Sequence, residues 1–408
     1  MSRACVIGLG TIGLPTAALL AARGWQVAGC DTDPAVLAAV RAGRAPFREV
    51  GLDALVRAAV ESGRLHAAAE PAAADHFVIA VPTPLAEGRR AGLAAVWAAT
   101  DALAPLLRPG NTVILESTSP VGTTERLAAR LAALRPDLVL PRPGGAPCPG
   151  TVHVAYCPER VLPGRMLEEL AANDRILGGV GAGCAAAALP LYEAFVAGRI
   201  ELAASRMAEL VKLAENAFRD VNIAFANELA GIAEGLGLDP WQAIALANRH
   251  PRVDILRPGP GVGGHCIAVD PWFLAEAAPG AAPLVRAARA VNDARPAQVA
   301  ARIRALAVRF RAPVVALYGL AYKPDVQDVR ESPALAVARA LAADPGIEVV
   351  ACDPMLDTAP PGVVLVEEAE ARARADIVAF LVAHQAFRAL SPVLFQDKAV
   401  VDAAGLFP

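Results

Sequence analysis

Short apolar runs rich in β-branched residues alternate with segments of helical periodicity through the first half of the chain. The first 30 residues predict a strand at 5–7, a helix at 14–23 and a second strand at 26–30. Further strands of the same kind are predicted at residues 77–81, 112–116 and 152–156. Continuous apolar strands that alternate with helices are typical of a doubly wound α/β sheet. We therefore expect an α/β domain over residues 1–200.

The periodicity changes after this domain. Residues 205–235 form one long helical stretch without proline, and a second helical stretch covers residues 284–307. These two stretches predict a helical domain at 201–300, in which a helix of that length commonly serves as the spine of a dimer. Strands return at residues 314–319, 348–352, 363–366, 377–382 and 399–402. They predict a second, smaller α/β domain at 301–408.

The composition of the chain argues against several classes of function. The 408 residues include 38 Lys and Arg against 41 Asp and Glu, for a formal charge of −3, which argues against a nucleic-acid partner. Hydrophobic residues make up 55% of the chain, but much of this is alanine, and no segment resembles a membrane span. The N-terminus shows no secretion signal, and the seven cysteines lack paired spacing, so we expect reduced thiols and a cytoplasmic protein.

The first motif with chemistry is the glycine pattern of Gly8, Gly10 and Gly13, directly after a strand and at the start of a helix. Glycines there let the backbone approach a pyrophosphate that rests on the N-terminus of the helix. Asp31 ends the second strand, where an acid binds the ribose of the adenosine half. No arginine follows within residues 31–33, so the pattern favours NAD over NADP. The alternative is a glycine turn without a ligand.

Two further features carry candidate chemistry. Lys212 and Asn216 are four residues apart on the long helix, so both can reach one substrate oxygen; the alternative is a solvated lysine. Four glycines between 259 and 264 precede Cys266, and such a segment can bring a thiol close to a ligand. The alternative is a cysteine that only fills the core.

A metal site is a weaker interpretation. Cys148, His153 and Cys157 lie close in sequence, and His265 with Cys266 could add ligands. The spacing matches no regular zinc pattern, and we expect no metal.

Six motifs together resemble the nucleotide-sugar 6-dehydrogenase family, which includes the UDP-glucose and GDP-mannose dehydrogenases. They occur in the family's order and are residues 8–13, 116–122, 157–160, Lys212 with Asn216, residues 261–270, and residues 323–324 with 329–333. The resemblance implies an N-terminal Rossmann domain for NAD, a central long-helix dimerisation domain and a C-terminal Rossmann-like domain for a UDP-sugar. The cofactor-binding residues are then Gly8, Gly10, Thr11, Ile12, Gly13, Asp31, Thr83 and Thr118.

The resemblance also implies a reaction, the four-electron oxidation of the sugar C6 alcohol to a uronic acid for polysaccharide biosynthesis. Cys266 would add to the intermediate aldehyde, giving a thiohemiacetal and later a thioester. Lys212 and Asn216 would stabilise the oxyanion, while Thr118 and Asp270 would hold water. Glu159 would take part in proton transfer. Which residue is the base of the first oxidation does not follow from the sequence.

The substrate-binding residues implied by the resemblance are Glu159, Arg160, Lys212, Asn216, Arg252, Gly263, Lys323 and Arg330. In the family, the arginine at the position of Arg252 often comes from the partner subunit, so a homodimer is expected. Other members carry a second glutamate where this chain has Pro163, so a scheme with two glutamates does not transfer. In the family, this proline is typical of the branch that acts on N-acetylated sugars. The motifs around Glu159 and Cys266 resemble those of members that act on UDP-N-acetyl-D-mannosamine, so this sugar is expected ahead of UDP-N-acetylglucosamine and UDP-glucose.

Two other function classes stay open at this point. A two-electron β-hydroxyacid-type dehydrogenase would share the NAD domain and the Lys212 to Asn216 pair, but would need neither Cys266 nor a third domain. A non-catalytic NAD-binding regulator would not need Lys212, Asn216, Cys266 and Asp270 together.

Overall fold

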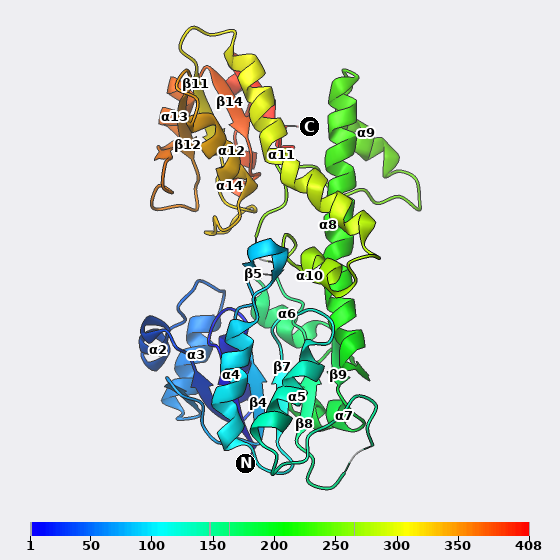
Figure 1. Ribbon diagram of the computed structural model, residues 1–408. Coiled ribbons are helices and arrows are strands. Elements are labelled where there is room, and N and C mark those ends of the chain that lie inside the picture. Colours follow the sequence, from blue (N-terminus) through cyan, green and yellow to red (C-terminus); the bar gives the residue numbers. More distant parts are fainter. Residues whose placement is uncertain (1, 147, 163, 265, 408) are drawn as a thin grey trace. The chain divides into compact units, whose positions relative to one another are not determined.

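The computed structural model describes residues 2–146, 148–162, 164–264 and 266–407. The chain divides into two compact units, Met1–Ala214 and Glu215–Pro408, and helix α8 (Ser205–Gly235) contains the point of division. The expected α/β fold with a helical middle section is confirmed (Figure 1). The expected boundaries at residues 200 and 300 stay predictions.

The first unit is built on a sheet that has eight strands in the described part of the chain, in the order β10-β9-β8-β7-β4-β1-β2-β3. Its strands are β1 (Arg3–Ile7), β2 (Gln26–Cys30), β3 (Leu65–Ala68), β4 (His76–Ile79), β7 (Thr112–Leu115), β8 (His153–Tyr156), β9 (Arg175–Gly179) and β10 (Ile200–Ala204). Among these described strands, only β8 and β9 pair antiparallel. The strand order reverses between β1 and β4, which is where doubly wound sheets bind ligands.

Helices cover both faces of this sheet. They are α1 (Gly13–Ala22), α2 (Pro34–Arg41), α3 (Leu52–Glu61), α4 (Ala94–Leu103), α5 (Thr123–Leu134), α6 (Met166–Ala172) and α7 (Cys184–Glu193), and a small hairpin joins β5 (Leu85–Ala86) to β6 (Arg90–Ala91). Side chains alternate between the faces along β1: Val6 packs in the core with Leu14 of α1, whereas Cys5 packs with Val96 of α4 and Leu127 of α5.

The second unit begins with helices and ends with a parallel sheet. Its helices are α9 (Pro240–Ala247), α10 (Asp270–Ala277), α11 (Pro283–Ala307), α12 (Pro333–Ala342), α13 (Glu368–Arg374) and α14 (Gln385–Arg388). Its strands are β11 (Val314–Tyr318), β12 (Glu348–Cys352), β13 (Val364–Leu365), β14 (Ile377–Phe380) and β15 (Ala399–Asp402). Their order is β13-β12-β11-β14-β15 in the described residues, which is the same winding as around β1 in the first unit.

Three helices share one kind of start, a short polar cap followed by proline. Asp33 before α2, Asp239 before α9 and Ser332 before α12 each accept a hydrogen bond from a backbone N–H of the first turn. Such caps satisfy amide groups that the helix leaves unpaired, and proline fits the first helical position because it has no N–H to lose. Within the described residues, no helix is both long enough and apolar enough to cross a membrane.

Candidate active site

The glycine turn after β1 has the shape that the sequence predicts. Gly8 has φ +95°, and a Cβ there would lie 2.4 Å from the Ala80 carbonyl oxygen. A Cβ on Gly13 would lie 1.8 Å from the Gly8 oxygen, but a Cβ on Gly10 would meet no described atom within 4 Å. The first and third glycines are therefore needed by the fold, whereas Gly10 leaves space above the turn. This cradle, at the N-terminus of α1, fits a pyrophosphate.

Asp31 shapes the same turn. Its Oδ2 accepts a hydrogen bond from the Leu9 amide at 2.8 Å, and its Oδ1 accepts one from the Asp33 amide at 2.9 Å. The side chain is half-buried. Asp31 thus holds the glycine turn to the end of β2, in addition to its predicted role at the ribose. The sequence pattern alone does not reveal this structural contact.

Thr83 and Thr118 come together at the carboxyl ends of β4 and β7. The Thr83 hydroxyl donates to the Thr118 carbonyl oxygen at 2.7 Å. Beside them, the Ser117 hydroxyl donates to the Val81 carbonyl oxygen at 2.7 Å. The loops that follow the two strands are therefore fastened to each other next to the switch point of the sheet.

A buried polar cluster, missed by the sequence analysis, supports this edge. Glu116 at the end of β7 accepts hydrogen bonds from the Tyr192 hydroxyl at 2.8 Å and from the Thr16 hydroxyl at 3.5 Å. Burial raises the pKa of Glu116, and the charge of nearby Arg175 opposes that rise. The Arg175 guanidinium lies 5.2 Å from the centre of the Tyr192 ring. Glu116 begins the 116–122 motif, but nothing in the sequence indicates that it meets Tyr192 and Thr16.

Lys212 on α8 contacts Glu159. Its Nζ donates to the Glu159 carbonyl oxygen at 2.8 Å and lies 3.7 Å from Glu159 Oε1. Both side chains are largely buried, with 7% and 13% of their surface exposed. The alternative of a solvated lysine is therefore wrong. Arg160 donates to the Asp174 carbonyl oxygen at 3.3 Å. Pro163 lies outside the described residues.

One turn earlier on α8, Glu209 is a second residue that the sequence analysis missed. Its carboxylate accepts hydrogen bonds from the Gly122 amide at 2.6 Å and from the Thr124 amide at 2.8 Å. These amides are at the start of α5, where a carboxylate also complements the helix dipole. Burial raises the pKa of Glu209, while these hydrogen bonds lower it. The contact fixes the Lys212 segment of α8 to the start of α5.

Asn216 meets Asp270 within the second unit. Asn216 Nδ2 donates to Asp270 Oδ2 at 2.5 Å, and Asp270 is buried. The backbone amide of Asp270 in turn donates to the Cys266 carbonyl oxygen at 2.8 Å. Three predicted catalytic residues are thereby joined at the start of α10, and Cys266 itself is half-buried.

The glycines before Cys266 pack against the loop after β11. A Cβ on Gly263 would lie 2.4 Å from the Glu331 carbonyl oxygen, and a Cβ on Gly264, at φ +80°, would lie 2.7 Å from the Tyr322 ring. Burial, together with the nearby charges of Asp328 and Cys266, raises the pKa of Tyr322 to about 12. Close packing therefore requires glycine here. His265 lies outside the described residues.

The predicted substrate cations have different surroundings. Lys323 Nζ lies 5.9 Å from the centre of the Tyr322 ring. Arg330 Nη2 forms an ion pair with Asp328 Oδ2 at 2.7 Å; the hydrogen bond to Asp328 raises the pKa of Arg330, and burial opposes that rise. Arg252 is exposed, and its amide donates to His250 Nδ1 at 3.3 Å. Among the described residues, no group of three or more His, Cys, Asp or Glu is arranged to hold a metal ion.

The doubly wound sheet and the cradle at its glycine turn are those of an NAD-dependent oxidoreductase. The domain profiles of one family match most of the chain, namely the NAD binding domain over residues 2–196, the central domain over 206–294 and the UDP binding domain over 316–407. The chain belongs to the UDP-glucose/GDP-mannose dehydrogenase family.

Two curated relatives and one solved structure show which members of the family this chain resembles. A protein of Ralstonia nicotianae named NDP-N-acetyl-D-galactosaminuronic acid dehydrogenase is 49% identical over 98% of this chain and 95% of its own. The UDP-N-acetyl-D-mannosamine dehydrogenase of Yersinia pestis is 45% identical over 98% of each chain. The structure of UDP-D-ManNAc dehydrogenase from Pyrococcus horikoshii superimposes with a TM-score of 0.88 at 35% identity, covering 100% of this chain and 96% of that chain. The protein is therefore similar to nucleotide-sugar dehydrogenases that act on N-acetylated sugars.

Proposed function

We propose that the protein oxidises the C6 hydroxyl of UDP-N-acetyl-D-mannosamine to the uronic acid in two NAD-dependent steps. The observation that carries this proposal is the hydrogen bond between Asn216 and Asp270, next to the backbone of Cys266. An amide donor, a buried carboxylate and a thiol are the groups that oxidation of an aldehyde through a thioester requires. We further propose that this reaction takes place in the cytoplasm and supplies a uronic acid for polysaccharide biosynthesis.

Each catalytic residue has a proposed role. Bound NAD supplies the hydride acceptor, held by the glycine cradle and Asp31. The Cys266 thiolate adds to the aldehyde carbon and remains attached as a thioester after the second oxidation, until water hydrolyses the C–S bond and returns the thiol. Asn216 and Lys212 stabilise the oxyanion at C6. Thr118 and Asp270 hold the water molecule.

The Lys212 and Glu159 contact supports proton transfer at the same oxygen. The 3.7 Å separation between Lys212 Nζ and Glu159 Oε1 allows the ammonium group and the carboxylate to share the role of donor and acceptor. The hydrogen bond from Lys212 to the Glu159 carbonyl fixes the lysine. Glu159→Gln should therefore lower kcat more than it raises the KM for the sugar.

The stoichiometry of the reaction tests the cysteine mechanism. Each sugar consumed should yield two NADH without release of free aldehyde, since Cys266 retains the aldehyde as a thiohemiacetal. Cys266→Ser should stop at or before the ester, because an alkoxide is a poorer nucleophile and leaving group near neutral pH than a thiolate. One NADH per sugar in the unmodified protein would favour a two-electron dehydrogenase instead.

The identity of the sugar needs a separate experiment. A site built to bind the acetamido group should discriminate strongly against a plain hydroxyl, since its buried polar groups would lose their partners. We expect kcat/KM with NAD to fall from UDP-N-acetylmannosamine to UDP-N-acetylglucosamine and then to UDP-glucose. The similarity to the Ralstonia nicotianae protein makes a nucleotide-linked N-acetylgalactosamine a further candidate, so that sugar belongs in the same comparison.

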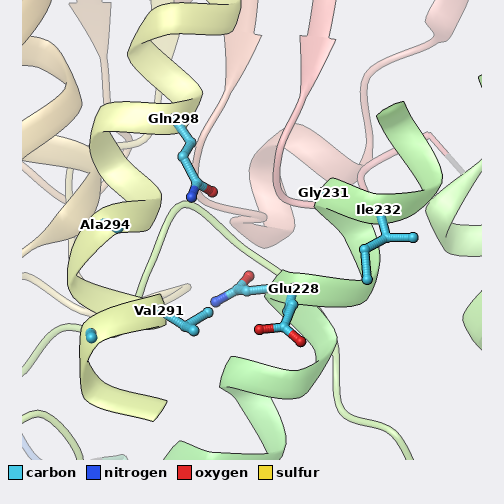
Figure 2. Close-up of a pocket in the computed structure, with 8 residues that line it drawn as sticks. Glu228, Gly231, Ile232, Val291, Ala294 and Gln298 are labelled. Carbon is cyan, nitrogen blue, oxygen red and sulfur yellow. The ribbon is translucent and has the colours of Figure 1, made fainter. Parts of the chain in front are cut away.

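We also propose a homodimer formed along α8. Phe218, Phe225 and Ile232 recur every seven residues and are 71%, 54% and 53% exposed, which is the spacing of helices that pack side by side. A groove between α8 and α11 lies next to this stripe, with Glu228 and Ile232 on one side and Val291 and Gln298 on the other (Figure 2). Phe225→Asp should yield monomers in light scattering, and dimers of that variant would refute the interface.

A further inference from the structure

The segment that leads to Cys266 is held by buried side chains that have no role in the mechanism above. The Gly259 amide donates to Oδ1 of Asn227 on α8 at 2.8 Å. The Gly259 carbonyl oxygen accepts from Nε of Arg295 on α11 at 3.1 Å. Asn227 is 1% exposed and Arg295 is 5% exposed. Two helices thus fix both polar groups of this one residue.

Asn227 belongs to a chain of buried hydrogen bonds. Its Nδ2 donates to Asn292 Oδ1 at 2.9 Å. Asn292 Nδ2 donates to Asp220 Oδ1 at 2.8 Å, and Asp220 Oδ1 also accepts from Arg289 Nη1 at 2.6 Å. Each asparagine side chain in this chain accepts with its oxygen and donates with its nitrogen. The ion pair of Asp220 with Arg289 therefore sets the orientation of Asn292, which in turn sets the orientation of Asn227 toward Gly259.

These residues continue the face of α8 that carries the predicted catalytic side chains. Asn216 follows Lys212 by four residues, Asp220 follows Asn216 by four, and Asn227 follows Asp220 by seven. A helix with 3.6 residues per turn keeps such positions on one face. The face that starts with oxyanion-stabilising residues therefore goes on to support the segment of the nucleophile.

The described part of this segment, residues 259–264, has little room to adjust. A Cβ on Gly261 would lie 3.0 Å from Pro333 and 3.2 Å from the Asn292 carbonyl oxygen. Gly263 and Gly264 are enclosed by the loop after β11. On the other side of Cys266, α10 holds its carbonyl oxygen. A displacement at Gly259 would therefore be passed along residues 259–264 toward Cys266, because their close contacts leave little room to absorb it.

The geometry points to Asn227 and Asn292 as positioning residues for the Cys266 thiol. This inference rests on the proposed cysteine mechanism. It assigns the two asparagines to the steps from aldehyde to acid, in which sulfur must reach the carbonyl carbon. The first oxidation, from alcohol to aldehyde, does not use the thiol and should be much less affected.

The test compares Asn227→Ala and Asn292→Ala with the unmodified enzyme, measuring NADH per sugar consumed and aldehyde trapped with semicarbazide. Since a misplacement of about 1 Å at a reacting group costs on the order of 100-fold, Asn227→Ala should slow acid formation at least roughly tenfold and release aldehyde. NADH per sugar should fall from two toward one, with the KM for NAD unchanged. Asn292→Ala keeps the bond to Gly259, so it should show a smaller effect of the same kind.

Asn222→Ala is the matched control. Asn222 is also on α8, and it bonds to the Asp254 carbonyl oxygen and the Leu256 amide at 3.0 Å each. This change removes hydrogen bonds of the same kind from an earlier part of the same loop. It should keep two NADH per sugar.

Three outcomes separate the two claims. If Asn227→Ala slows both oxidations equally and keeps a ratio of two, Asn227 is merely structural, and the inference is overturned while the proposed function stands. If the unmodified enzyme itself gives a ratio of one, the cysteine mechanism fails first. If Asn227→Ala does not fold, Asn292→Ala decides, because aldehyde release supports positioning and a ratio of two overturns it.

Discussion

The turns that follow β1 and β11 are built alike but end differently. In the first unit, the Gly8 amide donates to the Cys30 carbonyl oxygen at 2.7 Å and Asp31 accepts from the Leu9 amide. In the second unit, the Gly319 amide donates to the Cys352 carbonyl oxygen at 2.9 Å, and Asp353 accepts from the Leu320 amide at 2.7 Å. Gly8 and Gly319 have φ of +95° and +93°. The first strand of each sheet is thus followed by the same kind of turn.

The two acids differ in what else they bind. Asp353 also accepts from the amides of Ala321 at 3.0 Å and Met355 at 2.9 Å, and His384 Nε2 lies 3.3 Å away. Within the described residues, Asp31 accepts hydrogen bonds from Leu9 and Asp33 alone. A carboxylate has about four acceptor positions. Asp353 therefore serves the fold entirely, while Asp31 retains capacity for a ligand hydroxyl.

The glycine patterns differ in the same direction. After Gly8 the chain continues with Gly10 and the cradle, but after Gly319 it continues with Ala321 and Tyr322. The Tyr322 ring is used to enclose Gly264. The turn after β1 therefore has space for a dinucleotide, whereas the turn after β11 carries the Tyr322 side chain, which packs against the segment before Cys266.

The largest expected effect is on stability. Asp353→Ala would leave several buried amides without an acceptor, so we expect the free energy of unfolding to fall by about 3–5 kcal/mol. Asp31→Ala removes only two partly exposed bonds and should cost about 1 kcal/mol. Urea unfolding of the two variants measures both values. Equal losses would show that the two acids are equivalent, and would break the comparison.

Several regular elements were predictable, because their signals are local, but β3, β9 and β10 were not predicted. The ends of α8 and of β2, β12 and β15 match the predicted residues, since apolar runs bounded by turn residues mark strands and an unbroken helical period marks a helix. The antiparallel pairing of β8 with β9 was not predictable, because periodicity carries no strand direction.

The site was predictable only where a motif has fixed spacing. Asp31 follows from its distance to the glycines, and Cys266 from the glycines before it. Glu209 and Asn227 instead act on Gly122 and Gly259, far away in the chain. Such side-chain to backbone contacts leave no periodic trace, so only the structure reveals them.

Cofactor preference is the next largest expected effect. In a variant that combines Asp31→Ser with Thr32→Arg, the predicted hydrogen bond to the ribose is lost and a partner for a 2′-phosphate is gained. We expect the ratio of kcat/KM for NAD to that for NADP to drop by on the order of 100-fold, since hydrogen bonds to charged groups contribute about 1.5–3 kcal/mol. The corresponding change at Asp353 cannot alter this ratio if the two acids have separate roles.

A smaller effect is expected at Gly10. Because a Cβ there meets no described atom within 4 Å, Gly10→Ala should leave the thermal midpoint unchanged but occupy the space for the pyrophosphate. The KM for NAD should rise by about tenfold, or roughly 1.4 kcal/mol of binding. Gly13→Ala is the contrasting variant, since its Cβ would collide with the Gly8 carbonyl and lower stability as well. A normal KM in Gly10→Ala would mean that NAD does not use the cradle.

The smallest expected effect is on acid stability and comes from His384. Burial raises the pKa of Asp353, but the approach of the His384 imidazole, with Nε2 3.3 Å from Oδ2, and the hydrogen bond from the Leu320 amide outweigh burial and hold the net pKa below the ordinary 3.8. A carboxyl with a depressed pKa in the folded state stabilises the protein above its ordinary pKa, and this contribution is lost as the pH falls through the folded value. His384→Ala removes the imidazole next to Asp353 Oδ2, so the folded pKa of Asp353 should rise and acid unfolding should begin at a higher pH. At neutral pH the loss should be about 1 kcal/mol. Circular dichroism between pH 6 and pH 2 measures the shift, with His66→Ala, at an exposed position, as the control. An unchanged acid midpoint in His384→Ala would show that the backbone amides alone hold Asp353 ionised.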